Sequence, residues 1–249
     1  MEKRKRAQTS FEYILIIGGA MLFTILVILI IRSGIISGQE SKVTNDTETL
    51  SDCYLRPGVL FFDNFDSASA ANWIPKAGTW AVQGNKYAQT APTPASTRYI
   101  SLTNKVFDNF TMTFRARSTN AVTTNKFFGV VFHSSSSANT NYMVFWWDSS
   151  GNTHNVYITK QKSATFTDRV FIDSAVVPGL LKNGNPEFKI RVYGDTVKVY
   201  EDDRLILSKD VGSSTFLLPV YYSGQIGFLT WGGIAGVTAE FDNICVYNE

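Results

Sequence analysis

Several aromatic and polar side chains between residues 115 and 231 are of the types that bind sugars. Aromatic faces stack on the C–H groups of a pyranose ring, and polar side chains fix its hydroxyl groups. The candidates are His133, Trp146, Tyr157, Trp231 and Arg115, with Arg191 as a second arginine nearby. If they share one face of a sheet, they form a groove for a glycan. Alternatively, these aromatic rings fill the core or face neighbouring subunits.

The same region offers little for hydrolysis of a glycan. Glycosidases place two carboxylates on either side of the scissile bond, and no Glu-x-Asp-x-x-Glu spacing occurs in the sequence. The acidic run Glu201-Asp202-Asp203 is typical of a solvated hairpin turn. Nucleophile-elbow, P-loop and zinc-protease motifs are also absent from the sequence. We therefore expect a protein that is not an enzyme.

The candidate residues are predicted to lie on β-strands. Apolar and polar residues alternate over 110–117, 155–159 and 187–193, which indicates strands with one buried face. We expect roughly 12 to 14 strands over residues 52–249, forming one antiparallel two-sheet jelly-roll sandwich. Because side chains alternate between the two faces of a strand, one of Trp146 and Trp147 points outward. His133 and Trp231 differ in parity from their apolar neighbours, so we expect both to face out.

Four stretches of this region, in their order and spacing, resemble concanavalin A-like (laminin G-like) jelly rolls. They are Leu60–Asp66, Gly129–His133, Gly224–Phe228 and Glu240–Tyr247. The fold that this resemblance implies is shared by lectins, carbohydrate-binding modules, glycan hydrolases and structural adhesion domains. It therefore does not decide among these functions.

The resemblance also bears on the two ends of the domain, because the termini of a jelly roll usually adjoin. Asp63, Asp66 and Asp242 would then approach one another and hold a structural calcium ion; alternatively, they are ordinary turn and edge carboxylates. Cys53 and Cys245 are the two cysteines of the chain. They would form a disulfide bond, which persists outside the cell.

The N-terminal part differs from the rest in hydropathy. The 19 residues from Tyr13 to Ile31 carry no charge, and as a helix they span about 28 Å, the thickness of a bilayer's hydrocarbon core. Basic residues at positions 3–6 precede this run, so we expect a cytoplasmic N-terminus and an exported remainder. The sequence predicts a hydrophobic helix over residues 8–37 and a polar linker over 38–51. Asn45 and Asn109 stand in glycosylation sequons.

The junction before the apolar run resembles the class III signal peptide of archaeal type IV pilin-like proteins. Gln8, Ser10 and Glu12 match the family pattern Gln-x-Ser-x-Glu before a hydrophobic helix, whereas Ile16 stands where the family often has leucine. The resemblance implies that a prepilin-type peptidase removes the leader, residues 1–7, by cutting after Ala7. It also implies that Glu12 pairs with the N-terminal amine of a neighbouring subunit. An uncleaved single-pass membrane anchor is the alternative.

These features together indicate a subunit of an archaeal type IV pilus-like surface filament. The helix would leave the membrane and pack against identical helices, forming a homo-oligomer, and the exported head would bind surface glycans as an adhesin. The first alternative is a membrane-anchored carbohydrate-binding protein that does not polymerise, and the second is a glycan hydrolase. The net charge of +2 argues against nucleic acid as the main partner, since phosphate binders need a concentrated positive surface.

Overall fold

The computed structural model describes Met21, Cys53 and residues 55–66, 70–90, 98–118, 127–148, 152–163, 168–179, 186–212, 221–231 and 239–248. The chain divides into two compact units, Met1–Asp52 and Cys53–Glu249, and we call the second unit the head. The helix expected over residues 8–37 and the linker over 38–51 lie outside the described residues, apart from Met21. Among the described residues, no helix has the length and hydropathy that crossing a bilayer requires.

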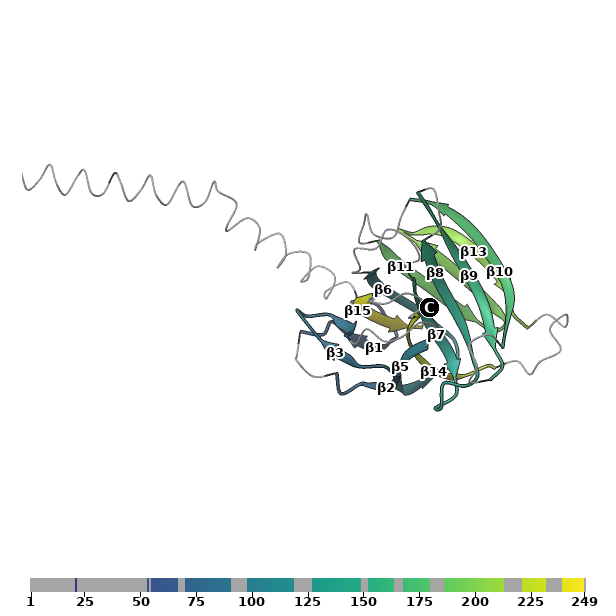
Figure 1. Cartoon of the computed structure of the whole chain (residues 1–249), viewed down its shortest axis with the longest axis horizontal. Helices are drawn as coiled ribbons and strands as arrows, with labels where there is room; N and C mark the ends of the chain where they lie inside the picture. The colour runs from purple at the N-terminus through teal and green to yellow at the C-terminus, as the bar shows by residue number, and fades with distance from the viewer. Residues whose placement is uncertain are drawn as a thin grey trace, which may run out of the picture. The chain divides into compact units, whose positions relative to one another are not determined.

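The described part of the head contains fifteen strands in two antiparallel sheets (Figure 1). Sheet A has the order β13 (Arg204–Asp210), β12 (Thr196–Glu201), β11 (Glu187–Tyr193), β6 (Phe110–Ser118), β15 (Ala239–Tyr247), β4 (Tyr87–Gln89) and β3 (Trp80–Val82), with β1 (Val59–Asp63) also paired to β15. Sheet B has the order β10 (Arg169–Pro178), β9 (Thr153–Gln161), β8 (Asn141–Asp148), β7 (Phe127–Ser134), β14 (Gly224–Trp231), β5 (Arg98–Phe107) and β2 (Trp73–Ala77). The predicted all-β two-sheet sandwich is thereby confirmed.

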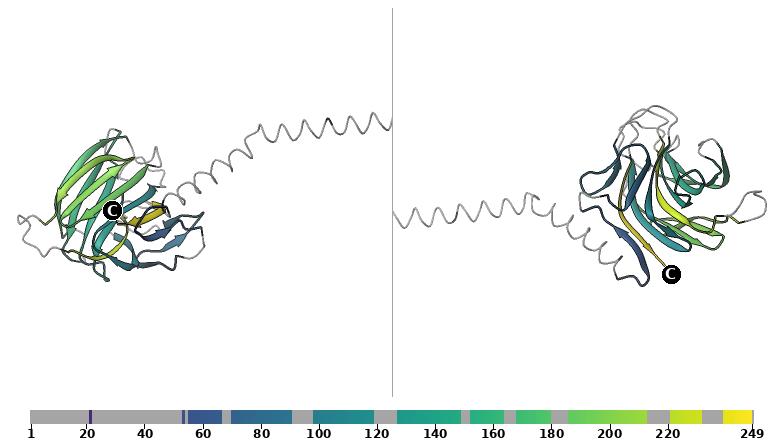
Figure 2. Two further views of the ribbon diagram at one scale, coloured as in Figure 1. Left: turned by 180° about the vertical axis from the view of Figure 1, so that it is seen from behind. Right: turned by 90° about the horizontal axis from the view of Figure 1, so that it is seen from below.

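The alternation of apolar and polar residues explains how each strand is placed. In β11, Phe188, Ile190 and Val192 are buried, whereas the residues between them are partly exposed. An apolar residue at every second position puts one face of a strand against the other sheet. The long strands of both sheets therefore cover a common core, and Figure 2 shows the resulting sandwich from behind and from below.

Aromatic rings from both sheets meet in this core. Phe228 of sheet B stacks on Phe241 of sheet A with 4.0 Å between the ring centroids. Trp146 of sheet B lies 4.7 Å from Phe188 of sheet A, edge to face. Burying a side chain of this size stabilises a fold by about 1.5–3 kcal/mol, and offset or edge-to-face ring pairs add to that. Many aromatic side chains of the described head therefore pack between the two sheets.

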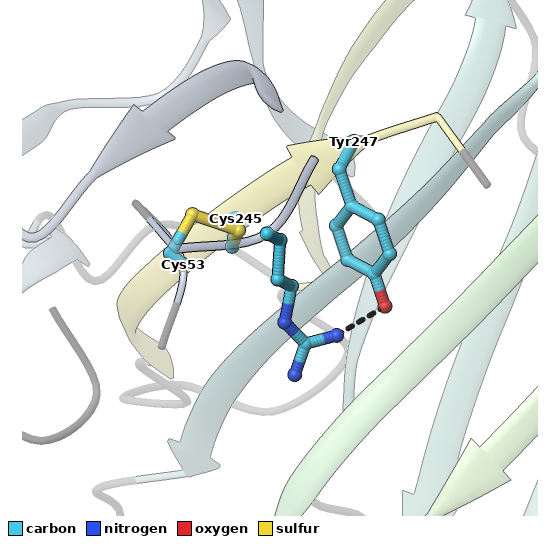
Figure 3. Close-up of a disulfide and its surroundings, with 4 residues drawn as sticks. Cys53, Cys245 and Tyr247 are labelled. Atoms are coloured by element: carbon cyan, nitrogen blue, oxygen red, sulfur yellow. Dashed lines mark hydrogen bonds between the residues drawn. A yellow bond between two sulfur atoms is a disulfide. The ribbon is translucent and has the colours of Figure 1, made fainter. Parts of the chain in front are cut away.

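The two ends of the described head lie together. Strand β1 pairs with β15, and the Asn248 N–H donates to the Gly58 carbonyl at 2.9 Å. Cys53 and Cys245 form the predicted disulfide, with 5.9 Å between their Cα atoms (Figure 3). Two residues after Cys245, the Tyr247 hydroxyl accepts a hydrogen bond from Arg56 Nη1 at 2.5 Å. Cys53 and Arg56 are therefore both bonded to side chains of β15, one by the disulfide and the other by a hydrogen bond.

Candidate functional site

Strands β7 to β10 are neighbours in sheet B, and each directs alternate side chains toward sheet A and away from it. The inward set, including Val130, Val144 and Ile158, belongs to the main core. The outward set forms a second apolar cluster on the outer face of the sheet. Its buried members are Ile100, Leu102, Phe127, Val131, Ala138, Met143, Phe145 and Leu229. Trp147 and Tyr157 pack against this cluster and are only partly buried.

Four rings from four neighbouring strands cross this face. We call Phe127, Phe145, Tyr157 and Phe171 the aromatic row. Its successive ring centroids are 4.8 Å, 4.8 Å and 5.7 Å apart. Exposure rises along the row, because Phe127 and Phe145 are buried, Tyr157 is half-buried and Phe171 is 52% exposed. The end of the row on β9 and β10 is therefore the part that a ligand can reach.

A glycine positions the buried half of the row. Gly129 of β7 lies opposite Phe145 of β8. A Cβ atom at this glycine would lie 2.7 Å from the Val144 carbonyl oxygen and 2.8 Å from the Phe145 Cβ. Both distances are closer than van der Waals contact, so the absence of a side chain at residue 129 lets Phe145 settle against the sheet.

Arg169 adds a positive charge to the accessible end of the row. Its guanidinium carbon lies 5.0 Å from the centroid of the Phe171 ring and 5.9 Å from that of Phe145, within the range of cation–π attraction. Burial lowers the pKa of Arg169 from its ordinary value. An arginine nevertheless stays charged at neutral pH, so the accessible end combines aromatic faces with a cationic hydrogen-bond donor.

Polar side chains flank the same end. Asn141, Gln161 and Arg169 are cross-strand neighbours on β8, β9 and β10. Asn141 Nδ2 donates to the Ala138 carbonyl at 3.1 Å, which leaves the side-chain oxygen as an acceptor. Neither that oxygen nor the buried Thr159 hydroxyl has a hydrogen-bond partner within the described part of the chain. Both residues are fully buried, so neither group is in contact with solvent at the accessible end.

The outward positions of β7, β8 and β9 with described side chains include no acidic residue. Hydrolysis of a glycosidic bond needs a pair of carboxylates on either side of it. The described outward side chains of these three strands can therefore stack on a sugar and hydrogen-bond to it, but they include no such pair. On β10, the fourth strand of the row, the Asp173 carboxylate lies 3.9 Å from Lys209 Nζ of sheet A.

Trp146, predicted as a sugar-binding ring, lies in the core instead. It is fully buried and stacks on Phe128 at 5.5 Å, in addition to its contact with Phe188. The alternation along β8 places Phe145 and Trp147 on the outer face, so the tryptophan between them must point inward. Trp147, 6.5 Å from Tyr157, takes the outward position.

His133 was expected to face outward, and this is wrong. It is 4% exposed, with ring nitrogens 2.6 Å from the Tyr221 carbonyl oxygen and 2.7 Å from that of Asp108. Its φ of 46° and the register shift between Gln225 and Gly227 on the partner strand interrupt the alternation on which the expectation relied. Burial lowers the pKa of His133, and the two backbone hydrogen bonds oppose that effect.

The remaining groove candidates are not brought together. Arg115 lies on the outer face of sheet A, opposite Asp242 of β15, and Arg191 lies on the same sheet, on β11. Trp231 ends β14, and its side chain lies outside the described residues. Of the five residues predicted for the groove, only Tyr157 belongs to the aromatic row.

Phe171 and Arg169, which complete the row, were missed in the sequence. Both lie on β10, where the register shifts between Phe171 and Asp173, so the alternation that marked other strands is broken there. The available signal was an arginine two residues before a phenylalanine in an apolar run, which is a weak pattern. Trp147 shares the parity of Phe145, but in this apolar run the sequence does not indicate which parity faces outward.

The predicted calcium ligands have other partners in the structure. The Asp63 carboxylate accepts hydrogen bonds from Trp73 Nε1 at 2.9 Å and from the Phe65 N–H at 3.0 Å. Asp66 accepts from the Asn64 side chain, and Asp242 accepts from the Asn243 N–H at 2.8 Å. No group of three His, Cys, Asp or Glu side chains within the described ranges is placed to hold a metal ion. A calcium ion at these residues stays a prediction.

Several other predicted residues lie outside the described part of the chain. They are Ala7, Gln8, Ser10 and Glu12 of the leader junction and Asn45 of the first sequon. Asn109, of the second sequon, is described and exposed. It lies in the turn between β5 and β6, and its side-chain oxygen accepts a hydrogen bond from the Gly194 N–H at 2.7 Å.

No protein-family model matches the chain, and no curated protein matches it. Solved structures do match. The carbohydrate binding module CBM66 from Bacillus subtilis has a TM-score of 0.56 and 20% identity, over 71% of this chain and 96% of that one. The carbohydrate recognition domain of Emp47p has a TM-score of 0.55 and 12% identity, over 77% and 97%. A Bacillus licheniformis beta-glucanase has a TM-score of 0.53 and 9% identity, over 77% and 99%.

At these identities the likeness shows the fold alone. The head has a jelly-roll sandwich of the concanavalin A-like kind, which confirms that part of the prediction. The same sandwich occurs in a binding module, a recognition domain and a hydrolase. The fold is therefore compatible with binding and with hydrolysis, and the choice between them rests on the side chains.

Proposed function

We propose that the head binds a glycan on the outer face of sheet B, at the accessible end of the aromatic row. The observation that carries this proposal is the arrangement of Tyr157 and Phe171, whose ring centroids are 5.7 Å apart on neighbouring strands. The two rings meet edge to face, with 68° between their planes. The platform for the C–H face of a sugar is therefore the more exposed Phe171 ring, with the half-buried Tyr157 ring beside it.

Polar groups around the platform support the same proposal. Arg169 supplies N–H donors beside Phe171, and the hydroxyl of the half-buried Tyr157 can donate and accept. Sugars need both kinds of group, because each hydroxyl donates and accepts. We propose binding rather than hydrolysis, since the described outward side chains of β7, β8 and β9 include no carboxylate.

The test is binding of the full-length protein, purified in detergent, to a panel of immobilised polysaccharides. Phe171→Ala should weaken binding about tenfold or more, which corresponds to about 1.4 kcal/mol. Val176→Ala is the matched control, because Val176 lies on the same strand and is similarly exposed. Binding to no polysaccharide, or equal loss in both variants, would contradict the proposal.

We further propose that the head is displayed on the cell surface by a pilin-like N-terminal segment. The support is the sequence: Gln8, Ser10 and Glu12 precede an uncharged run of filament-helix length. The Cys53–Cys245 disulfide is consistent with an oxidising compartment. The subunit would assemble as a homo-oligomer through its helix, after a prepilin-type peptidase has removed residues 1–7.

Two measurements test this display. Mass spectrometry of the protein from its native cells should give a mature chain that begins at Gln8, whereas a chain that begins at Met1 would exclude processing. Electron microscopy of cells lacking the protein should show loss of filaments for a major subunit, or filaments with reduced adhesion for a minor one. Unchanged filaments and unchanged adhesion would contradict the pilus proposal and leave glycan binding by the head to be judged separately.

A further inference from the structure

A hollow of about 280 Å³ opens where the turn between β5 and β6 meets the end of β11. Its walls include Asp108, Asn109, Thr111, Arg191, Tyr193 and Asn248. Pockets for drug-sized ligands begin at about 300 Å³, so this hollow suits a ligand no larger than one sugar ring. None of these residues belongs to the aromatic row on sheet B.

The rim of the hollow is held in place by hydrogen bonds to Gly194 and to His133, and by one hydrogen bond within the turn. The Asn109 side-chain oxygen accepts from the Gly194 N–H at 2.7 Å. The Asp108 side chain accepts from the Asn109 N–H at 2.6 Å. Behind the turn, the Asp108 carbonyl oxygen contacts the ring of the buried His133 at 2.7 Å. A rim fixed in this way loses little conformational freedom when a ligand binds.

Two groups on the rim lack partners within the described residues. The Tyr193 ring is 65% exposed and takes part in no ring contact or hydrogen bond there. Among the described residues, the side-chain oxygen of Asn109 accepts a hydrogen bond from the Gly194 N–H, whereas Nδ2 makes none. The Arg191 guanidinium belongs to the adjoining wall. An open aromatic face beside amide and guanidinium donors is the composition of a sugar-binding site.

We propose that this hollow binds one pyranose ring, stacked on Tyr193 beside Arg191. The sugar can come from two sources. One is a free saccharide, and the other is the first sugar of a glycan attached to Asn109 itself, which begins the sequon Asn109-Phe110-Thr111. In the second case a bond forms between Asn109 Nδ2 and C1 of the sugar, Nδ2 loses a proton, and the phosphate group of a lipid-linked donor leaves from C1.

The first experiment tests the free saccharide. The full-length chain, made in a host without N-glycosylation and purified in detergent, is titrated calorimetrically with the methyl glycosides of glucose, galactose, mannose and N-acetylglucosamine. The titrated chain carries Phe171→Ala, which removes the proposed site on sheet B. In that background, adding Tyr193→Ala should weaken binding about tenfold or more, whereas adding Leu205→Ala, at an exposed side chain of sheet A outside both sites, should leave binding unchanged. Binding that depends on Tyr193 in this background belongs to the hollow and not to the proposed function of sheet B.

The second experiment tests the attached glycan. The chain carries Asn45→Gln, which removes the other sequon, and is made in a host that glycosylates sequons. After proteolytic digestion, the mass of the peptide containing Asn109 is measured by mass spectrometry. If the attached sugar occupies the hollow, glycosylation should raise Tm by about 2–4 °C, and Tyr193→Ala should abolish that increase. The same Tyr193→Ala change in the unglycosylated chain is the control, and its Tm should change little because the ring is exposed.

A Tyr193-dependent result in either experiment supports the hollow as a sugar site and identifies the source. The proposal is overturned if no methyl glycoside binds through Tyr193 and if Asn109 either carries no glycan or carries one whose effect on Tm does not depend on Tyr193. Phe171→Ala tests the proposed site on sheet B, so its effect on polysaccharide binding neither supports nor overturns the proposal for the hollow.

Discussion

The rings of Phe145 and Tyr157 stack directly across the β8–β9 pair, with centroids 4.8 Å apart and 26° between their planes. Phe145 is 2% exposed, whereas Tyr157 is half-buried. Phe145 packs within the apolar cluster and supports Tyr157, and Tyr157 is partly exposed to solvent. Phe145 therefore contributes to stability, whereas Tyr157 is placed to contact a ligand.

This division predicts different effects at the two positions. Tyr157→Ala should weaken glycan binding about tenfold or more and lower the free energy of unfolding by about 1 kcal/mol. Phe145→Ala should lower the free energy of unfolding by about 3–5 kcal/mol, because it leaves a cavity. Tyr157→Phe is the control, since it keeps the stacking ring, and it should bind almost normally. Binding assays and urea unfolding on the same preparations separate the effects, and weak binding by Tyr157→Phe would assign the contact to the hydroxyl instead.

Trp146→Ala should act on stability and not on ligand contact. The ring is fully buried among core aromatic residues, so its removal should cost about 3–5 kcal/mol in the free energy of unfolding. Trp147→Ala, at the neighbouring outward position, should cost less, because that ring is only partly buried. Equal destabilisation by the two variants in urea titrations would contradict the inward direction of Trp146 and the outward direction of Trp147.

Removal of the disulfide should destabilise the head. Cys53 and Cys245 are 192 residues apart in sequence, and closing a loop of that length is worth about 5 kcal/mol in the chain-entropy description. The double variant Cys53→Ala, Cys245→Ala avoids a single unpaired thiol. Its denaturation midpoint should fall well below that of the oxidised protein and close to that of the reduced one. Two reactive thiols in the unfolded, unreduced wild-type protein would contradict the bond itself.

Two buried tyrosines should make the head sensitive to alkali. Burial raises the pKa of both Tyr87 and Tyr142 from 10.0 to about 12, and a hydrogen bond with Ser101 partly offsets this for Tyr87. Above pH 10 the unfolded chain releases these protons while the folded chain retains them. Stability should therefore be fully present below pH 10 and fall as the pH rises through 12, by about 2–3 kcal/mol per tyrosine.

The measurement is a pair of pH titrations. Tyrosinate absorbance of the folded protein should show two residues that ionise later than the others, and Tm should fall over the same range. Tyr87→Phe and Tyr142→Phe should each reduce the alkaline loss of Tm. Ionisation of all tyrosines near pH 10 without unfolding would contradict the burial of these hydroxyls.

Much of the fold could be predicted from the sequence, because it depends on short-range alternation. Phe188, Ile190 and Val192 alternate with charged residues and form a strand. Alternation also implied that only one of Trp146 and Trp147 faces outward, but not which one, since both neighbours along the strand are apolar. The disulfide was predictable once the termini of the head were expected to adjoin.

The candidate site was less predictable, because it depends on where alternation fails. The strand register shifts opposite His133, and the histidine ring is buried instead of facing outward. The register also shifts next to Phe171, which breaks the apolar–polar alternation by which β10 could have been recognised. The aromatic row also needs four strands in one order, β7 to β10, which no local pattern specifies. Arg115 shows the same problem, since its strand belongs to the other sheet.

The most direct test of the central claim is a map of the residues that a bound glycan touches. Hydrogen–deuterium exchange of the full-length protein, with and without a polysaccharide that it binds, reports each strand separately. In the Tyr193→Ala chain, which lacks the sugar contact proposed for the hollow on sheet A, we predict protection confined to β8, β9 and β10 around Trp147, Tyr157 and Arg169, with sheet A unchanged. Protection of sheet A alone, or no protection at saturating glycan, would contradict the assignment of glycan binding to the outer face of sheet B.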